Sequence, residues 1–253
     1  FPGEKAEIIG GQLLSEWVHD EGNIYKTFVG IGTKFYSFFE NGHRCRMART
    51  PDVGYLAITS DINTYQFGYT EGDLPEPFDY SDAQVVGWQK EHWWTITQPI
   101  TAIDYANNIV SIDNPTPWGL PQGNMYFVQG SKDFLDQPGE FYLDQSTGWI
   151  YYWPLKLPIE NQEIIAATTK RVIEIKGSSE SKIARNIKFE DLAFSISDSY
   201  ESYTTSYPRQ GNPEPMMDGL VHIENAENVT VKNCIIENTG TNGIVLYRHT
   251  KNN

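Results

Sequence analysis

The clearest hydrophobic pattern lies in the last third of the chain, where apolar residues occupy alternate positions in short runs separated by Asn and Gly. These runs align with one another. "NIKFEDLAFSIS" (186–197) matches "NVTVKNCIIENT" (228–239) at an offset of 42, and "VIEIKG" (172–177) matches "LVHIEN" (220–225) at an offset of 48. A repeat near 24 residues, stretched where a loop is inserted, is typical of a β-solenoid.

The last repeat raises a question of register. "DGLVHIENAEN" (218–228) matches "NGIVLYRHTKN" (242–252) at an offset of 24, whereas the apolar alternation itself pairs Val221 with Ile244, at an offset of 23. A slip of one residue along a strand would exchange the inward and outward side chains. We therefore expect an offset of 23 within this strand, with the extra residue taken up in the turn that follows.

Stacking explains why such a repeat is stable. Each short strand points alternate side chains to one face, and a single coil cannot bury that face alone, so the coils must stack. Asn and Gly suit the corners because they tolerate a left-handed backbone. We expect Asn233 at such a corner, with its side chain bonded to the neighbouring coil. The side chains expected to point inward are Val221, Ile223, Val229, Val231, Cys234 and Ile236.

The rest of the chain follows a different pattern. Alternating strands and Pro-rich joints occupy residues 13–165, and "EFYLDQSTGWIYYWP" (140–154) is typical of a β-hairpin. "AEIIGG" (6–11) looks like one more strand of the repeat, and the polar residues 199–217 interrupt it. The predicted organisation is an early β-helix coil at 1–12, an inserted β-rich subdomain at 13–165, and β-helix coils at 166–253 with an inserted loop at 199–217.

Composition and charge narrow the class of protein. Aromatic residues make up 13% of the chain, with 21 Gly and 14 Pro, which favours strands and turns. The formal net charge of −14 disfavours nucleic acid and anionic membrane surfaces as partners. No apolar run approaches the roughly 20 residues of a membrane span, so we expect no membrane insertion. Cys45 and Cys234 are too isolated in sequence to form a disulfide framework, and we expect free thiols.

The sequence lacks the motifs of several common chemistries. Its five His residues show no metal-ligand spacing and no HExxH motif. It contains no P-loop, no GxGxxG and no GxSxG elbow. We therefore expect neither a bound metal nor a cofactor.

Several stretches together resemble a known group of proteins. They are "FPGEKAEIIGGQ", "RCRMARTPDVGYL", "GEFYLDQSTGWIYYWP", "NIKFEDLAFSISDS" and "VHIENAENVTVKNCIIENTGTNGIVL". In this order they resemble the secreted right-handed parallel β-helix proteins, and most of all the β-helix glycoside hydrolases that include β-xylosidases and α-L-fucosidases. The repeat alone is less specific, because pectate lyases, polygalacturonases, alginate lyases and phage tailspikes share it.

The resemblance implies a fold, a location and a longer chain. The expected fold is all-β: a right-handed parallel β-helix with an inserted β-sandwich-like subdomain. The expected location is extracellular or at the cell surface, with the periplasm as the alternative. Proteins of this group have a coil before the equivalent of Phe1 and more coils after that of Asn253, so we expect this sequence to be part of a longer protein. The ends of the solenoid are also expected to allow self-assembly.

The candidate site residues follow from this resemblance, from strand alternation and from their place beside the inserted loop. Glycoside hydrolysis uses two carboxyl groups, about 5–5.5 Å apart for retention and about 6.5–9.5 Å for inversion. Asp218 precedes the strand that resembles the groove strand of polygalacturonases, so it is the first catalytic candidate, and Asp198 is the second. Thr241 and Asn242 stand where polygalacturonases carry an Asp pair, which argues against that activity. The substrate-binding candidates are His222, Glu224, Asn242 and Arg248.

Four of these candidates also have an ordinary structural explanation. An Asp before a Gly, such as Asp218, is common in turns, and Asp198 has the position to bond a loop backbone. His222 and Glu224 also fit a solvated strand face.

Three functions remain after these considerations. The first is a glycoside hydrolase acting on an extracellular polysaccharide or oligosaccharide, in which one carboxyl is the general acid and the other the nucleophile or base. The alternative is a non-catalytic β-helix protein of a surface, adhesin or filament, and the third is a polysaccharide lyase. Carbohydrate is the expected partner of the enzyme.

Overall fold

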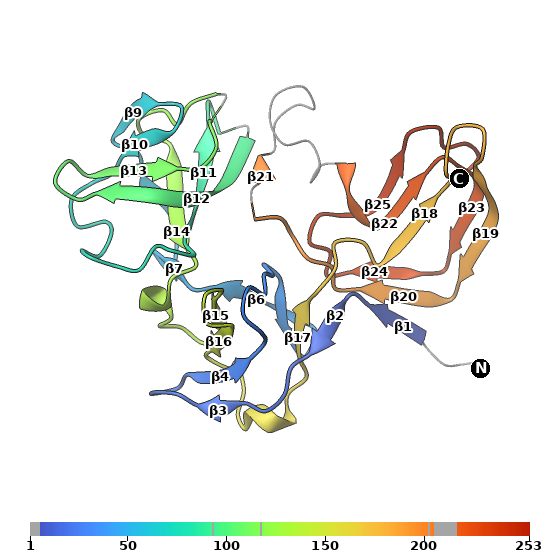
Figure 1. Ribbon diagram of the computed structural model, residues 1–253, viewed down its shortest axis with the longest axis horizontal. Coiled ribbons are helices and arrows are strands. Elements are labelled where there is room, and N and C mark those ends of the chain that lie inside the picture. Colours follow the sequence, from blue (N-terminus) through green and yellow to red (C-terminus); the bar gives the residue numbers. More distant parts are fainter. Residues whose placement is uncertain (1–5, 93, 117, 202, 205–216) are drawn as a thin grey trace.

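The computed structural model describes residues 6–253 apart from 93, 117, 202 and 205–216 (Figure 1). The described chain is all-β: its regular structure consists of strands and two short 3-10 turns, η1 (Lys132–Phe134) and η2 (Ile159–Asn161). No helix within this part is long and apolar enough to cross a membrane. The inserted loop expected at 199–217 lies largely outside the described residues.

Three groups of parallel strands form the part of the fold that contains the C-terminus (Figure 1). The predicted offsets are confirmed, because Ile173 pairs with Val221 at 48 and Ile187 pairs with Val229 at 42. The first group contains β1 (Ala6–Ile9), β20 (Leu192–Ser195) and β24 (Ile235–Glu237). The second contains β18 (Ile173–Lys176), β22 (Gly219–Glu224) and β25 (Asn242–Tyr247), and the third contains β19 (Ala184–Glu190) and β23 (Ala226–Lys232).

The register of the last repeat also agrees with the sequence. Val221 pairs with Ile244, at the expected offset of 23. Glu227 then forms a parallel bridge with Lys251, at an offset of 24. The extra residue is therefore taken up in the turn after β25, as predicted.

Left-handed positions recur in stacked layers, near the start of β19 and β23 and directly after their ends. Asn186 and Asn228 have φ values of 60° and 57°, and Asp191 and Asn233 have φ values of 58° and 53°. Both pairs are 42 residues apart, so the same corner recurs in adjacent layers. Among the described residues, the bond between stacked asparagines forms at Asn228 rather than at Asn233: Asn228 Nδ2 donates to Asn186 Oδ1 at 3.2 Å.

Most of the residues expected to point inward lie in the core between the parallel strands. Val221, Ile223 and Val229 are at most 4% exposed, and Cys234 and Ile236 pack against this core while remaining partly exposed. Cys234 is a free thiol, as is Cys45 in the antiparallel part of the fold.

Two larger sheets occupy the other part of the fold and, apart from β21, use strands between residues 11 and 167. Their strands pair antiparallel except that β15 pairs with β6 in parallel. The first contains β7 (Arg49–Thr50), β8 (Leu56–Ala57), β9 (Ser60–Asn63), β10 (Gln66–Gly68), β11 (Gln84–Gln89), β12 (Trp94–Asp104), β13 (Ile109–Ile112), β14 (Met125–Gln129) and β21 (Tyr203–Thr204). The second contains β2 (Gly11–Leu13), β3 (Val18–His19), β4 (Tyr25–Phe28), β5 (Phe38–Glu40), β6 (His43–Met47), β15 (Glu140–Asp144), β16 (Trp149–Tyr152) and β17 (Ile164–Ala167). The division of the chain into domains stays a prediction.

The segment that follows β20 joins the two parts of the fold. Ile196 packs with Phe39 and Ile165 of the second antiparallel sheet. The Asp198 carboxylate accepts a hydrogen bond from the Tyr36 amide at 2.8 Å, and the Glu201 carbonyl accepts one from Gln84 Nε2 at 2.7 Å. These contacts fix the segment on both sides of Tyr200, whose side chain reaches the site described next.

Candidate functional site

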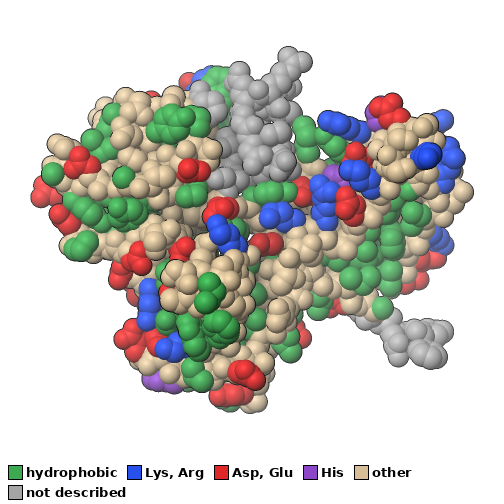
Figure 2. Space-filling model, viewed as in Figure 1, with side chains coloured by type: hydrophobic (Ala, Val, Ile, Leu, Met, Phe, Trp, Pro, Cys, Tyr) green, Lys and Arg blue, Asp and Glu red, His purple; other side chains and the backbone are tan. Residues whose placement is uncertain are grey.

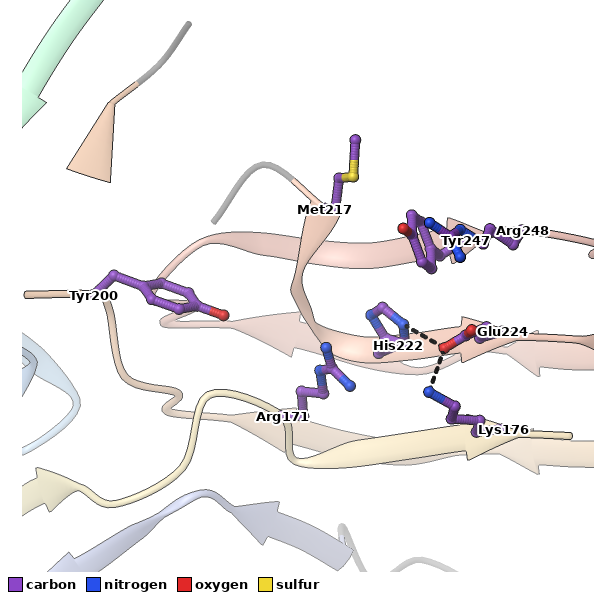
Figure 3. A pocket seen from close by; sticks show the side chains of 8 residues that line it. All are labelled: Arg171, Lys176, Tyr200, Met217, His222, Glu224, Tyr247 and Arg248. Atoms are coloured by element: carbon purple, nitrogen blue, oxygen red, sulfur yellow. Dashed lines mark ion pairs between the residues drawn. The ribbon is translucent and has the colours of Figure 1, made fainter. Parts of the chain in front are cut away.

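A pocket of about 510 Å³ lies on the outward face of the sheet formed by β18, β22 and β25 (Figure 3). Because Val221 and Ile223 point into the core, the alternate residues His222 and Glu224 face the pocket. Figure 2 shows Lys and Arg side chains over this part of the surface, interspersed with Asp and Glu. The described residues that line the pocket are Arg171, Lys176, Tyr200, Met217, His222, Glu224, Tyr247 and Arg248.

Asp218, immediately before β22, is held by two of these lining residues. Its Oδ1 accepts a hydrogen bond from Arg171 Nε at 2.5 Å, and its Oδ2 accepts one from the Tyr200 hydroxyl at 2.6 Å. The amide of Gly219 donates a third bond to Oδ1 at 2.9 Å. The carboxylate therefore accepts three hydrogen bonds, which compensate for its burial at 3% exposure.

These donors set the ionisation state of Asp218. Burial raises the pKa of the carboxyl, but the hydrogen bonds from Tyr200, Arg171 and the Gly219 amide outweigh burial and leave the pKa below its ordinary value. A carboxylate that receives several such bonds prefers the charged form. Asp218 is thus an anion at neutral pH, suited to act as a base, as a nucleophile or as an electrostatic stabiliser.

His222 lies between two carboxylates at the centre of the pocket (Figure 3). Its Nδ1 is 3.4 Å from Asp218 Oδ1, and its Nε2 is 3.9 Å from Glu224 Oε2. The residue is only 2% exposed, yet neither ring nitrogen forms a hydrogen bond within the described part of the chain. Burial, followed by the charge of Arg171, lowers the pKa of His222, so the ring is neutral at neutral pH. A neutral imidazole offers one donor and one acceptor, which a hydroxyl of a ligand can satisfy.

The other end of the pocket contains an ion pair and a further cation. Lys176 Nζ lies 2.8 Å from Glu224 Oε2, and this bond lowers the pKa of Glu224. The guanidinium of Arg248 lies 4.9 Å from the centre of the Tyr247 ring. Across the described residues, Arg248 forms no ion pair with a carboxylate.

The structure brings together four of the six candidate site residues from the sequence. His222, Glu224 and Arg248 line the pocket, and Asp218 bonds to two lining residues. Asn242 instead supports the strand, because its Nδ2 donates to the backbone carbonyl of Asp218 at 2.8 Å. No observation tests the role of any of them in catalysis or binding, so these roles stay predictions.

Asp198 is not among the described residues that line the pocket. It is 6% exposed, and its Oδ1 accepts the Tyr36 amide at 2.8 Å. Burial raises the pKa of this carboxyl, and backbone amides such as that of Tyr36 only partly offset the effect. The shift is therefore opposite in direction to that of Asp218.

The sequence did not single out Arg171, Lys176, Tyr200, Met217 and Tyr247 as site residues. Register alone could have identified two of them, since Lys176 and Tyr247 pair with Glu224 from the neighbouring strands. Arg171 and Tyr200 lie in irregular segments, where the alternation of strands carries no information.

A second cluster of acids lies outside the pocket. Ligand atoms of Asp52, Asp136 and Glu140 lie within 4.8 Å of one another. Glu140 is already paired, because Arg46 Nε lies 3.1 Å from its Oε1 and the backbone amides of Asp136 and Gln137 donate to its Oε2. These contacts give the cluster a structural explanation without a metal ion.

Comparison with known proteins shows the fold of the chain. No model of a known protein family matches the chain, and no curated protein matches it either. A solved structure described as "Glycoside hydrolase" is similar, with a TM-score of 0.78 and 18% sequence identity. The match covers 96% of this chain and 49% of that protein, so the chain spans about half the length of its structural neighbour. At this identity the similarity concerns the fold alone.

Proposed function

We propose that the protein is a glycoside hydrolase that acts on an extracellular polysaccharide or oligosaccharide in the pocket over β22. One observation carries the proposal: the buried, ionised carboxylate of Asp218 lies 3.4 Å from His222, a buried ring that lines the pocket without a hydrogen-bond partner in the described chain. Buried polar groups normally have partners, and a cluster with perturbed pKa values in a pocket is typical of a functional site.

The proposal includes the fold and the location. We infer that the three parallel groups are coils of a right-handed parallel β-helix with an inserted β-sandwich-like subdomain. The offsets of 42 and 48 between paired strands and the similarity to a larger glycoside hydrolase structure support this inference. Secretion to the exterior, the cell surface or the periplasm accords with a polysaccharide substrate.

The proposed mechanism assigns different roles to two carboxyl groups. Asp198 is the second carboxyl proposed from the sequence, and its raised pKa suits a general acid, although it is not among the described residues that line the pocket. Asp218, with its lowered pKa, is the nucleophile or base, and Asp198, with its raised pKa, is the candidate general acid. Arg171 and Tyr200 keep Asp218 charged and in place, and His222 binds a hydroxyl group of the sugar.

A binding protein without turnover is the second candidate. Asp198, the candidate acid, is bonded to the Tyr36 amide and does not line the pocket. Glu224, the acid that does line it, is paired with Lys176 and has a lowered pKa. A pocket that lacks a protonated carboxyl would bind a sugar without cleaving it.

The test is an assay of the chain on a panel of plant, algal and bacterial polysaccharides and their oligosaccharides. It would measure both binding and the release of new reducing ends. Asp218→Asn keeps the size of the side chain and removes its charge, so it should lower kcat by roughly 100-fold or more. Glu237→Gln, an exposed acid on β24, is the matched control and should leave the rate unchanged.

Each result assigns the protein to one class. Turnover that depends on Asp218 supports a hydrolase. An unsaturated sugar as the product would identify a lyase, and binding without any product would favour the second candidate. The absence of both binding and product across the panel would contradict a carbohydrate function.

A further inference from the structure

We propose that the sugar bound in this pocket carries an anionic group, a carboxylate or a sulfate, and that Arg248 and Lys176 bind that group. The proposal deepens the carbohydrate function proposed above and rests on it. It concerns the end of the pocket where β18 and β22 finish and β25 gives way to Arg248.

The composition of the pocket departs from that of the chain. The whole sequence has 33 acids and 19 Lys and Arg residues, with a formal net charge of −14. Of the described side chains that line the pocket, Arg171, Lys176 and Arg248 are cationic, and Glu224 alone is acidic. Asp218 and Glu174 pair with Arg171, and Glu224 pairs with Lys176, so Arg248 is the cation of the pocket whose charge is left to attract an anion.

The cations differ in how far they are already paired. Arg171 is already paired with two carboxylates: its Nε donates to Asp218 at 2.5 Å, and one terminal nitrogen donates to Glu174 at 2.7 Å. Lys176 pairs with Glu224 at 2.8 Å, which leaves other directions of its ammonium group open. Arg248 is exposed and forms no ion pair with a carboxylate in the part of the chain that the structure describes, although its charge acts on Glu224. Its guanidinium offers the planar donors that suit carboxylates and sulfates.

The spacing of the residues suits a substituted sugar. His222 and Glu224 are two residues apart on β22, which places their Cα atoms about 6.6 Å apart. A ligand whose hydroxyl bonds the unpartnered ring of His222 therefore extends along β22 toward Arg248 and Lys176 (Figure 3). The Tyr247 ring, 5.7 Å from the His222 ring, offers an apolar face between these two points.

The experiment measures binding of matched charged and neutral oligosaccharides to the 253-residue chain. The carboxylate probes are an oligogalacturonide and its fully methyl-esterified form. The sulfate probes are a sulfated galactan oligosaccharide and its desulfated form. Arg248→Gln and Lys176→Gln are the test variants. Arg185→Gln is the control, because this arginine on β19 is also exposed and lies outside the pocket.

We expect at least one charged probe to bind more tightly than its neutral form. Arg248→Gln should weaken that binding about 10-fold or more, Arg185→Gln should leave it unchanged, and added salt should weaken it. The pair of probes that shows the difference identifies carboxylate or sulfate as the group. Equal binding of charged and neutral forms, unaffected by Arg248→Gln, would overturn this inference and leave the carbohydrate function standing. Failure of every probe here and of the whole polysaccharide panel would overturn both.

Discussion

Asp218 and His222 lie four residues apart across the start of β22, and their side chains approach to 3.4 Å between Oδ1 and Nδ1. Both residues are at most 3% exposed. Asp218 is charged and accepts three hydrogen bonds. His222 is neutral, and its ring nitrogens have no hydrogen-bond partner within the described chain. Because the His222 ring nitrogens have no hydrogen-bond partner among the described residues, a bound ligand could supply one. The first two predictions below follow from this arrangement.

Tyr200→Phe should raise the pKa of Asp218. The Tyr200 hydroxyl donates to the carboxylate at 2.6 Å, and this bond favours the charged form. Because the pKa of Asp218 is lowered in the folded protein, its contribution to stability is present above the unfolded pKa and is lost as pH falls through the folded pKa. The variant should lose about 1 kcal/mol of stability at neutral pH, and the acid limb of its pH–rate profile should move to higher pH.

Tyr247→Phe is the matched control for that prediction, because Tyr247 lines the same pocket and is not among the described donors to Asp218. It should leave the acid limb in place. An equal shift in both variants would contradict a specific role for Tyr200.

His222→Asn should change how stability depends on pH. Burial lowers the pKa of His222 below its ordinary value of about 6.5, so the unfolded chain binds a proton that the folded chain resists. Stability of the wild type should therefore fall as pH decreases below about 6.5. Urea unfolding between pH 5 and pH 8 should show a flatter curve for the variant. His43→Asn, at an exposed position, should keep the slope of the wild type, and an identical slope in all three proteins would refute the prediction.

Glu140→Gln should increase the free energy of unfolding, relative to the wild type, more at high pH than at low pH. Burial raises the pKa of Glu140 to about 7, and the backbone amides and Arg46 only partly offset the effect. Between about pH 4.5 and pH 7 the folded carboxyl retains a proton that the unfolded chain loses, so wild-type stability falls as pH rises. Relative to the wild type, the variant should gain roughly 1–3 kcal/mol between pH 4 and pH 8. A difference that stays constant over this range would show that the ion pair with Arg46 keeps the carboxyl charged.

Substitutions at Asn228 should show how much the stacked left-handed positions contribute to stability. Replacement by Ala removes the bond to Asn186, and Ala tolerates the left-handed backbone less well than Asn because it lacks the short polar side chain, at a combined cost of about 2 kcal/mol. Replacement by Gly removes the bond but tolerates the φ of 57°, so it should cost about 1 kcal/mol. Chemical denaturation of both variants measures the two contributions. A greater loss for Gly than for Ala would contradict the account of the corner.

The parallel strands could be predicted from the sequence because stacked layers repeat the same alternation. The offset of 42 from Ile187 to Val229 and the offset of 23 from Val221 to Ile244 both follow from apolar residues that must share one face. The antiparallel sheets could not be ordered in this way. Their pairings, such as β11 with β14, join segments whose local patterns do not specify a partner.

The site could be predicted only in part, for a related reason. Strand alternation placed His222 and Glu224 outward but did not predict the burial of His222, which depends on neighbouring side chains such as Tyr247. The bonds from Arg171 and Tyr200 to Asp218 span 47 and 18 residues and come from irregular segments. The hydrogen bond from the Tyr36 amide to Asp198 could not be predicted either, because Tyr36 lies in the antiparallel part of the chain.

The most direct test of the central claim is the ¹⁵N NMR signal of the His222 ring during titration with the oligosaccharide that the panel identifies. The ring nitrogens have no hydrogen-bond partner in the described chain, so a sugar hydroxyl that binds there must change their signals. We predict that both signals shift as the pocket fills, and that the shift is lost on Asp218→Asn if that carboxylate helps to position the sugar. A sugar that binds or reacts while the His222 signals stay unchanged would contradict the assignment of this pocket as the carbohydrate site.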